Sequence, residues 1–166
     1  MDPRAYIGWD IGGAHLKAAC LNGDGRVEDV LQLPCPLWQG MPHFLDAFEQ
    51  VLSRLPGGEA CHAITMTGEL VDLFPNRANG VRQLLAAVAS RLPAERIRVF
   101  AGDAGFVSLE TGAELVEQVA SANWMATAAY IAPCLPQGLL VDIGSTTTDI
   151  VPVKGRTRAL GRTDHE

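Results

Sequence analysis

Residues 139–153 read LLVDIGSTTTDIVPV: an apolar run reaches Asp142, turns through Gly-Ser-Thr-Thr-Thr and leaves as a second β-branched run. Threonine and isoleucine favour extended backbone, and Gly144 suits a tight reversal between two strands. The turn therefore presents a carboxylate, several hydroxyl groups and free backbone N–H groups at one point. This set suits a phosphate with its divalent metal, because N–H and hydroxyl groups receive oxygens while carboxylates hold the cation. An ordinary hairpin cap is the alternative.

The same plan recurs near the start of the chain, where residues 6–19 read YIGWDIGGAHLKAA. Asp10, like Asp142, stands two residues before a glycine, and two such hairpins in one chain are much less expected by chance than one. Lys17 follows on the outgoing strand, where its cation could reach a terminal phosphate. The alternative for Lys17 is a solvated lysine on an edge strand.

Composition indicates a globular protein, since the 166 residues are 48% hydrophobic and 19% charged, which is enough to bury a core. No apolar run reaches the roughly 18 residues of a membrane span, and no signal peptide is recognisable. We therefore expect a cytoplasmic protein without a membrane partner. The net charge of −6, with no lysine or arginine cluster, argues against a nucleic-acid partner. The four cysteines and four histidines lack metal-ligand spacing.

Apolar spacing and turn signals divide the chain into alternating elements. We predict strands over 6–10, 15–22 and 26–33, a helix over 41–55, a strand over 62–66, a helix over 81–92 capped by Asn79, a strand over 97–100, and helix in one or two pieces over 110–132. Strands over 139–142, 147–153 and 157–160 then begin a second meander.

This order of elements predicts an α/β fold with a mixed five-stranded sheet and helices on its faces. Right-handed crossovers place the fourth and fifth strands parallel to the first, which gives the strand order 3-2-1-4-5. We predict one domain over residues 1–137, followed by the opening β-hairpin of a second, related domain over residues 138–166.

Strand-Asp-x-Gly hairpins in this order resemble the sugar kinase/Hsp70/actin superfamily, whose members bind or cleave ATP between two related halves. The resemblance implies a ribonuclease H-like (actin-like ATPase) domain. Residues 10–13, DIGG, resemble the first phosphate loop of that superfamily, and Lys17 falls where several members carry a phosphate-contacting basic residue. Residues 142–149, DIGSTTTD, resemble the second phosphate loop in its hydantoinase A/oxoprolinase form.

Within that superfamily, four stretches resemble the tetrahydromethanopterin-linked C1 transfer pathway proteins. They are GWDIGGAHLK at 8–17, MTGEL at 66–70, GDAGF at 102–106 and ASANW at 120–124. That family is related to the archaeal enzyme of methanofuran biosynthesis that condenses an aminomethylfuran diphosphate with γ-glutamyltyramine. Its members continue for about as many residues again. We therefore expect a truncated second domain, or one completed by a complementing chain or a homo-oligomer.

A phosphate-binding cleft between the two halves is what the resemblance implies. Asp10 and Asp142 would position Mg²⁺, directly or through water, and Lys17 would neutralise developing charge. The phosphates of ATP or of a small-molecule diphosphate substrate would be bound by Gly12, Gly13, Lys17, Gly144, Ser145, Thr146 and Thr147.

Three carboxylates are candidate catalytic bases, because each follows a strand or turn that could face the cleft. They are Glu69, Asp103 and Asp149. The structural alternatives are, respectively, a loop carboxylate, a helix-capping aspartate and a hairpin stabiliser.

The resemblance thus implies an enzyme of methanofuran-type cofactor biosynthesis, in which a tyramine phenol displaces diphosphate from an aminomethylfuran. One alternative is ATP-dependent hydrolysis of a cyclic amide, as in hydantoinases and oxoprolinases. The other is a non-catalytic half-domain that a partner chain completes.

Overall fold

The computed structural model describes residues 5–55, 59–143 and 148–154. The chain forms two compact units, Met1–Ala122 and Asn123–Glu166, and each is described by itself. The division into domains at residue 137 stays a prediction.

The first unit is built on one mixed sheet of strand order β3-β2-β1-β4-β5-β6. Strands β1 (Ala5–Ile11), β2 (His15–Asn22) and β3 (Val27–Pro34) form an antiparallel meander. Strand β4 (Ala60–Met66) runs parallel to β1, and β5 (Ile97–Phe100) runs parallel to β4. The α/β class, the order 3-2-1-4-5 and the ribonuclease H-like topology are therefore confirmed. A short sixth strand, β6 (Phe106–Ser108), pairs antiparallel with β5 and was not predicted.

Four helices accompany this sheet: α1 (Met41–Arg54), α2 (Arg77–Ala89), α3 (Leu109–Glu114) and α4 (Val116–Val119). The prediction that Asn79 caps the second helix is wrong. Asn76 is the cap, and its side chain accepts a hydrogen bond from the backbone N–H of Asn79 at 2.8 Å. Short 3₁₀ turns lie in the connections between these elements, namely η1 (Leu37–Gln39), η2 (Gly68–Leu70), η3 (Ala94–Arg96) and η4 (Gly102–Ala104).

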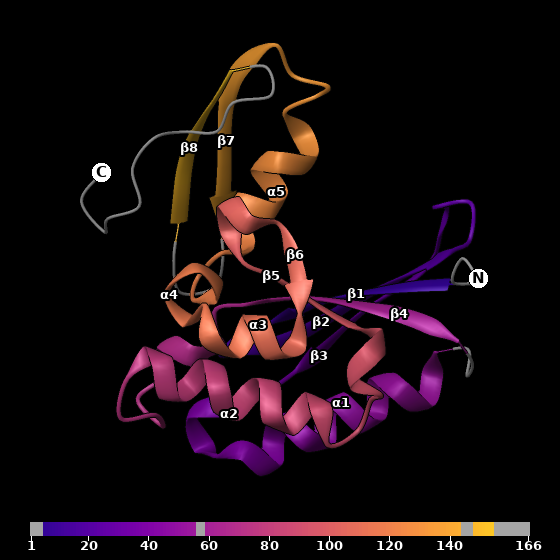
Figure 1. The fold of residues 1–166 in the computed structure, drawn as a ribbon, viewed down its shortest axis with the longest axis vertical. Helices are drawn as coiled ribbons and strands as arrows, with labels where there is room; N and C mark the ends of the chain where they lie inside the picture. The colour runs from indigo at the N-terminus through magenta and orange to yellow at the C-terminus, as the bar shows by residue number, and fades with distance from the viewer. Residues whose placement is uncertain (1–4, 56–58, 144–147, 155–166) are drawn as a thin grey trace. The chain divides into compact units, whose positions relative to one another are not determined.

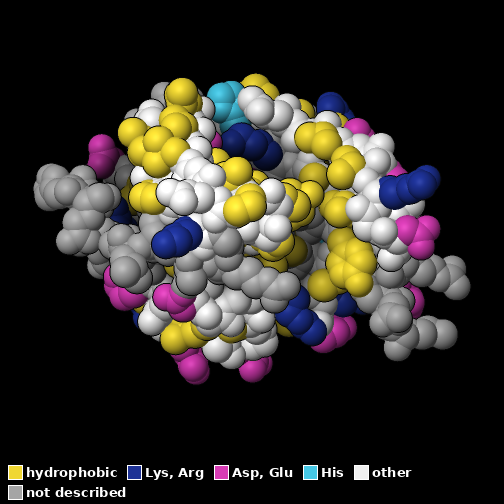
Figure 2. All heavy atoms as spheres, turned by 90° about the horizontal axis from the view of Figure 1, so that it is seen from above, with side chains coloured by type: hydrophobic (Ala, Val, Ile, Leu, Met, Phe, Trp, Pro, Cys, Tyr) yellow, Lys and Arg dark blue, Asp and Glu magenta, His cyan; other side chains and the backbone are white. Residues whose placement is uncertain are grey.

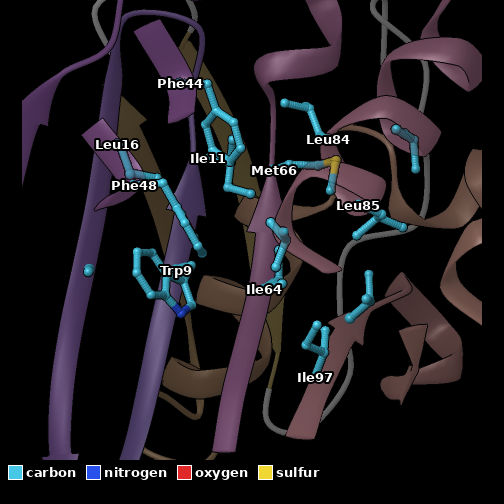
Figure 3. Close-up of a cluster of buried hydrophobic side chains, with 14 of the residues drawn as sticks. Trp9, Ile11, Leu16, Phe44, Phe48, Ile64, Met66, Leu84, Leu85 and Ile97 are labelled. Atoms are coloured by element: carbon cyan, nitrogen blue, oxygen red, sulfur yellow. The ribbon is translucent and has the colours of Figure 1, made fainter. Parts of the chain in front are cut away.

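One face of the sheet packs against α1 and α2, which lie on the same side of it (Figure 1). Alternate residues of each strand point to that face, so β1 buries Ile7, Trp9 and Ile11. Trp9 stacks on Phe48 of α1 with ring centroids 4.4 Å apart, on the left of the cluster drawn in Figure 3. Each large side chain buried in this way contributes about 1.5–3 kcal/mol. The opposite residues of the same strands are left to form the site.

The second unit contains α5 (Asn123–Ile131) and an antiparallel hairpin of β7 (Gln137–Ile143) and β8 (Thr148–Lys154). Its small core consists of Ala128, Ala132, Val151 and Val153. The hairpin confirms the two strands predicted at this point of the sequence. The strand predicted over 157–160 lies outside the described residues.

The helical region predicted over residues 110–132 forms three helices. Leu115, with φ −85° and ψ 44°, separates α3 from α4. Ser121 lies between α4 and α5 and has a left-handed backbone, φ 52°. A left-handed residue cannot continue a right-handed helix, so the helical pattern is interrupted there.

No helix among the described residues is both long and apolar enough to cross a membrane. On the face drawn in Figure 2, lysine and arginine side chains lie singly between apolar and acidic ones.

His62 is a buried polar residue of the core, 5% exposed. The indole N–H of Trp9 donates to its Nδ1 at 3.1 Å, so the imidazole acts as an acceptor in its neutral form. Burial, and secondarily the positive charge of Arg96, lowers the pKa of His62 to about 4.

We predict that acid destabilises the fold through His62. An unfolded histidine takes up a proton near pH 6.5, whereas His62 stays neutral down to about pH 4. The free energy of unfolding should therefore fall as pH drops through this window, by about 1.4 kcal/mol per pH unit from this group. Urea unfolding of wild type and His62→Gln at several pH values measures this pH dependence. Glutamine is chosen because its side-chain oxygen can still accept the hydrogen bond from Trp9. Parallel pH profiles for the two proteins would contradict the assignment.

Candidate functional site

The turn between β1 and β2 is held against the loop that follows β4. The Thr67 N–H donates to the carbonyl of Ile11 at 3.0 Å, which extends the β1–β4 ladder past the end of both strands. A Cβ at Gly68 would lie 3.1 Å from the carbonyl oxygen of Ile11 and 3.3 Å from that of Gly12. The two loops therefore touch through their backbones.

Both glycines of the predicted first phosphate loop are closely packed, Gly12 against backbone and Gly13 against a side chain. A Cβ at Gly12 would lie 2.8 Å from the carbonyl oxygen of His15, and one at Gly13 would lie 2.7 Å from Cγ1 of Val71. The N–H of Gly12 is donated to the carbonyl of His15 at 3.0 Å. Gly12 therefore shapes the turn, and a phosphate would have to use other N–H groups.

Asp10 and Lys17 lie directly opposite each other on β1 and β2. The Lys17 Nζ donates to Oδ2 of Asp10 at 3.0 Å, and the two side chains are 51% and 26% exposed, respectively. The other oxygen, Oδ1, is buried and has no hydrogen-bond partner in the part of the chain that the structure describes. The residue predicted to hold a metal thus pairs with the cation predicted to contact phosphate, and one carboxylate oxygen is left for a ligand.

An apolar hollow of about 300 Å³ lies beside this ion pair on the same face of the sheet. Its floor is made of small residues in register on three neighbouring strands, because Gly8 lies opposite both Ala19 and Ala63. Val30 and Phe106, both exposed, also line it. The hollow can take a flat, largely apolar group with a charged end next to Asp10 and Lys17.

Glu69 lies in η2, directly after the contact between the two loops, and is only 2% exposed. The Ser121 hydroxyl donates to its Oε1 at 2.7 Å. Its Oε2 is buried without a hydrogen-bond partner within residues 5–55, 59–143 and 148–154. Burial raises the pKa of Glu69. The hydrogen bond from the Ser121 hydroxyl, backbone hydrogen bonds from Glu69 and Ser121, and lastly the charge of Arg77 act in the opposite direction. Glu69 is thus a carboxyl group of the loop after β4, and it is buried next to the turn.

Asp103 lies in η4, just after β5, and its side chain is exposed. Because the carboxyl ends of parallel strands meet at one edge of a sheet, Asp103 shares that edge with the end of β1 and the loop after β4.

Thr65 was not singled out from the sequence, but it lies opposite Asp10 on β4. Period-two alternation along β4 was the signal that could have identified it.

Asp142 and Asp149 lie directly opposite each other in the hairpin of the second unit. Burial, and then the negative charge of Asp142, raises the pKa of Asp149. The remaining predicted phosphate ligands, Gly144, Ser145, Thr146 and Thr147, lie outside the described residues. The described residues contain no group of three or more histidine, cysteine or acidic side chains placed to hold a metal. The Mg²⁺ site and the cleft that joins Asp10 to Asp142 stay predictions.

The fold and the β1–β2 turn define a ribonuclease H-like domain with a strand-Asp-x-Gly turn at one sheet edge. The chain belongs to the hydantoinase/oxoprolinase family, whose model matches residues 60–164. It is 30% identical over 159 residues to the (4-{4-[2-(gamma-L-glutamylamino)ethyl]phenoxymethyl}furan-2-yl)methanamine synthase of Methanocaldococcus jannaschii. That match covers 95% of this chain and 46% of the synthase, so the chain spans about half the length of its curated relative.

Solved structures with a similar arrangement include two sugar-kinase-type proteins. A putative 2-dehydro-3-deoxygalactonokinase from Sinorhizobium meliloti has a TM-score of 0.48 at 14% identity. The superposition covers 94% of this chain and 51% of the kinase chain. A ROK family glucokinase from Streptomyces griseus has a TM-score of 0.47 at 17% identity, covering 95% of this chain and 47% of its own.

We predict that Gly12→Ala destabilises the first unit while Gly8→Ala does not. The new Cβ at position 12 would meet a backbone carbonyl at 2.8 Å, whereas at position 8 its nearest neighbour lies 4.0 Å away. Overpacking of this kind costs about 1–3 kcal/mol, and alanine in a strand is better than glycine by about 0.5–1 kcal/mol. Urea unfolding of both variants tests this. Equal stabilities would contradict the packing account.

We also predict that Asp142→Asn lowers the pKa of Asp149, because the substitution removes the like charge that lies opposite it. A titration of the side-chain carboxyl carbons by carbon-13 NMR measures the change. Burial of Asp149 persists in the variant, so its pKa should stay above the ordinary value. An unchanged pKa would mean that the two carboxylates do not face each other.

Proposed function

We propose that this chain supplies the phosphate-binding half of an enzyme of methanofuran-type cofactor biosynthesis. The reaction would join the phenol oxygen of a tyramine unit to the methylene carbon of an aminomethylfuran diphosphate. The new carbon–oxygen bond forms as the bond to diphosphate breaks. Its electron pair leaves with the diphosphate, and a base takes the phenol proton.

One observation carries this proposal: the Asp10–Lys17 pair lies beside an apolar hollow, next to a glycine turn, in a chain similar to the synthase over 95% of its length. The name of that synthase describes a phenoxymethyl group on a furan that also carries a methanamine. A hollow with a charged end suits a ring of that kind bearing a diphosphate.

Lys17 would offset the charge that develops on the leaving diphosphate. The buried Oδ1 of Asp10 lacks a partner within the described residues, and carboxylate oxygen is the donor that Mg²⁺ prefers. We therefore propose Asp10 and Asp142 as the residues that would hold the ion, directly or through water. When bound, Mg²⁺ would neutralise part of the diphosphate charge.

The base is proposed among Glu69, Asp103 and Asp149. A carboxylate accepts a proton more readily near neutral pH when its pKa is raised, and this is the direction found for Glu69 and Asp149. Burial is the first cause in both residues.

The rest of the cleft is proposed to come from a further segment, a second copy or a complementing chain, because the chain spans about half the length of the synthase. We place the reaction in the cytoplasm, with small phosphorylated molecules as its partners.

ATP-dependent hydrolysis of a cyclic amide is the second candidate, and it is favoured by the family match over residues 60–164. In that reaction the same turn would bind the phosphates of ATP.

The test is to incubate the chain, together with the segment or chain that completes its cleft, with Mg²⁺, an aminomethylfuran diphosphate and γ-glutamyltyramine. Diphosphate release and the mass of the ether product are measured. Lys17→Met should lower kcat/KM by about 10²–10³-fold, as expected for the loss of one group that stabilises transition-state charge. Lys154→Met is the matched control, because it removes the other lysine of the chain, at the end of β8.

Three outcomes would contradict the synthase proposal in different ways. ATP hydrolysis stimulated by oxoproline or a hydantoin, without ether formation, would favour the second candidate. An equal decrease of kcat/KM in Lys17→Met and Lys154→Met would show that Lys17 has no specific role in the site. A monomer with no affinity for ATP or diphosphate would favour a non-catalytic half-domain.

A further inference from the structure

The carboxyl group of Glu69 accepts a hydrogen bond from a residue at the C-terminal end of the first unit. That unit ends at Ala122, and the residue before it, Ser121, donates its hydroxyl to Oε1 of Glu69 at 2.7 Å. The two residues are 52 positions apart in the sequence. This hydrogen bond therefore fixes the end of the unit to the loop after β4.

The same loop is in direct contact with the phosphate-binding turn. Gly68, the neighbour of Glu69, packs against the carbonyl oxygens of Ile11 and Gly12, and Val71 fills the space beside Gly13. Gly80 of α2 packs on the other side, where its Cβ would lie 2.9 Å from both Cα and Cβ of Glu69. With backbone packed on both sides, Glu69 cannot move without moving the loop.

The left-handed backbone at position 121 would favour glycine, so the presence of serine there needs another explanation. A φ of 52° is the left-handed region, which glycine adopts at no steric cost and other residues adopt at some cost. Serine adds a hydroxyl that donates to a buried carboxyl group, and hydrogen bonds to carboxylates are stronger than neutral ones. The second carboxyl oxygen, Oε2, is buried without a partner among the described residues. The Ser121 hydroxyl is the side-chain donor to the group, beside backbone hydrogen bonds from Glu69 and Ser121 themselves. Its loss should therefore loosen the orientation of the carboxyl group.

We propose that Ser121 is a positioning residue: its hydroxyl sets the carboxyl group of Glu69, and through the loop after β4 it sets the shape of the Gly12–Gly13 turn. The inference rests on the proposed function only in assigning diphosphate as the ligand of that turn. The contacts themselves connect Ser121, at the end of the first unit, to the Gly12–Gly13 turn through the loop after β4.

Two substitutions separate the hydroxyl from the backbone. Ser121→Ala removes the hydroxyl and keeps a Cβ in the left-handed conformation, whereas Ser121→Gly removes the hydroxyl and also relieves the backbone. Both leave Arg77, the charged neighbour of Glu69 on α2, in place. The glycine variant should therefore be at least as stable as the alanine variant in urea unfolding.

The first readout needs no ligand. In both variants the pKa of Glu69, followed by carbon-13 NMR of its carboxyl group, should rise above that of wild type, because a donor to the charged form is lost. The amide resonances of Gly12 and Gly13 should shift in both. Resonances and a Glu69 pKa that match wild type in both variants would overturn the proposal.

The second readout is the affinity of each protein for magnesium diphosphate by calorimetry. Both variants should bind about tenfold more weakly than wild type, as expected for one lost hydrogen bond to a charged group. The alternative result is that the glycine variant binds magnesium diphosphate like wild type while the alanine variant binds it weakly. This would show that Ser121 acts through its backbone conformation, and it would overturn the proposal. Wild type that binds no diphosphate would refute the proposed function, and the first readout would then decide on Ser121.

Discussion

Parallel pairing of β1 with β4 is the constraint on which the rest of the site depends. Its register runs from Ala5 opposite Ala60 to Ile11 opposite Met66, and the Thr67 N–H adds one more hydrogen bond to Ile11. Because side chains alternate along a strand, the packing that sends one set of residues into the core against α1 and α2 sends the other set outward. Core packing therefore positions Asp10, and the extended ladder brings the glycine turn into contact with the loop that carries Glu69.

The charged groups at this sheet edge are held with different strengths. The Asp10–Lys17 pair is partly exposed, and pairs of this kind contribute only about 0–1 kcal/mol to stability. A ligand can therefore separate them at little cost. Glu69 is buried, and a buried carboxylate is costly unless it is hydrogen-bonded, so the contact with Ser121 is needed where the carboxylate is charged. The site thus combines an ion pair that can open with a buried carboxyl group that is fixed in place.

Local patterns in the sequence predicted the framework but not the long-range contacts. Alternation in β2 and the helical spacing in α1 are local signals that predicted individual elements. The right-handed crossover rule, applied to the order of those elements, then predicted the order of the first five strands. The cap at Asn76 was missed because Asn79, three residues later, has the same chemistry. Strand β6 has only three residues, too few for a period to show. The contact between Glu69 and Ser121 joins two loops through the tertiary fold, and no local pattern encodes it.

The most direct test of the account is the response of the backbone amides to magnesium diphosphate. In a nitrogen-15 NMR titration of the 166-residue chain, the largest shifts should fall on Gly13 and Gly68, on the two loops that the β1–β4 ladder brings together, and on Lys17 of β2. Gly8→Ala should show the same pattern with diphosphate, because Gly8 lies in the floor of the apolar hollow and on neither loop, and its new Cβ would lie 4.0 Å from its nearest neighbour. Shifts that leave these loops unchanged, or no shifts at any concentration of the ligand, would contradict a phosphate-binding turn at this edge of the sheet.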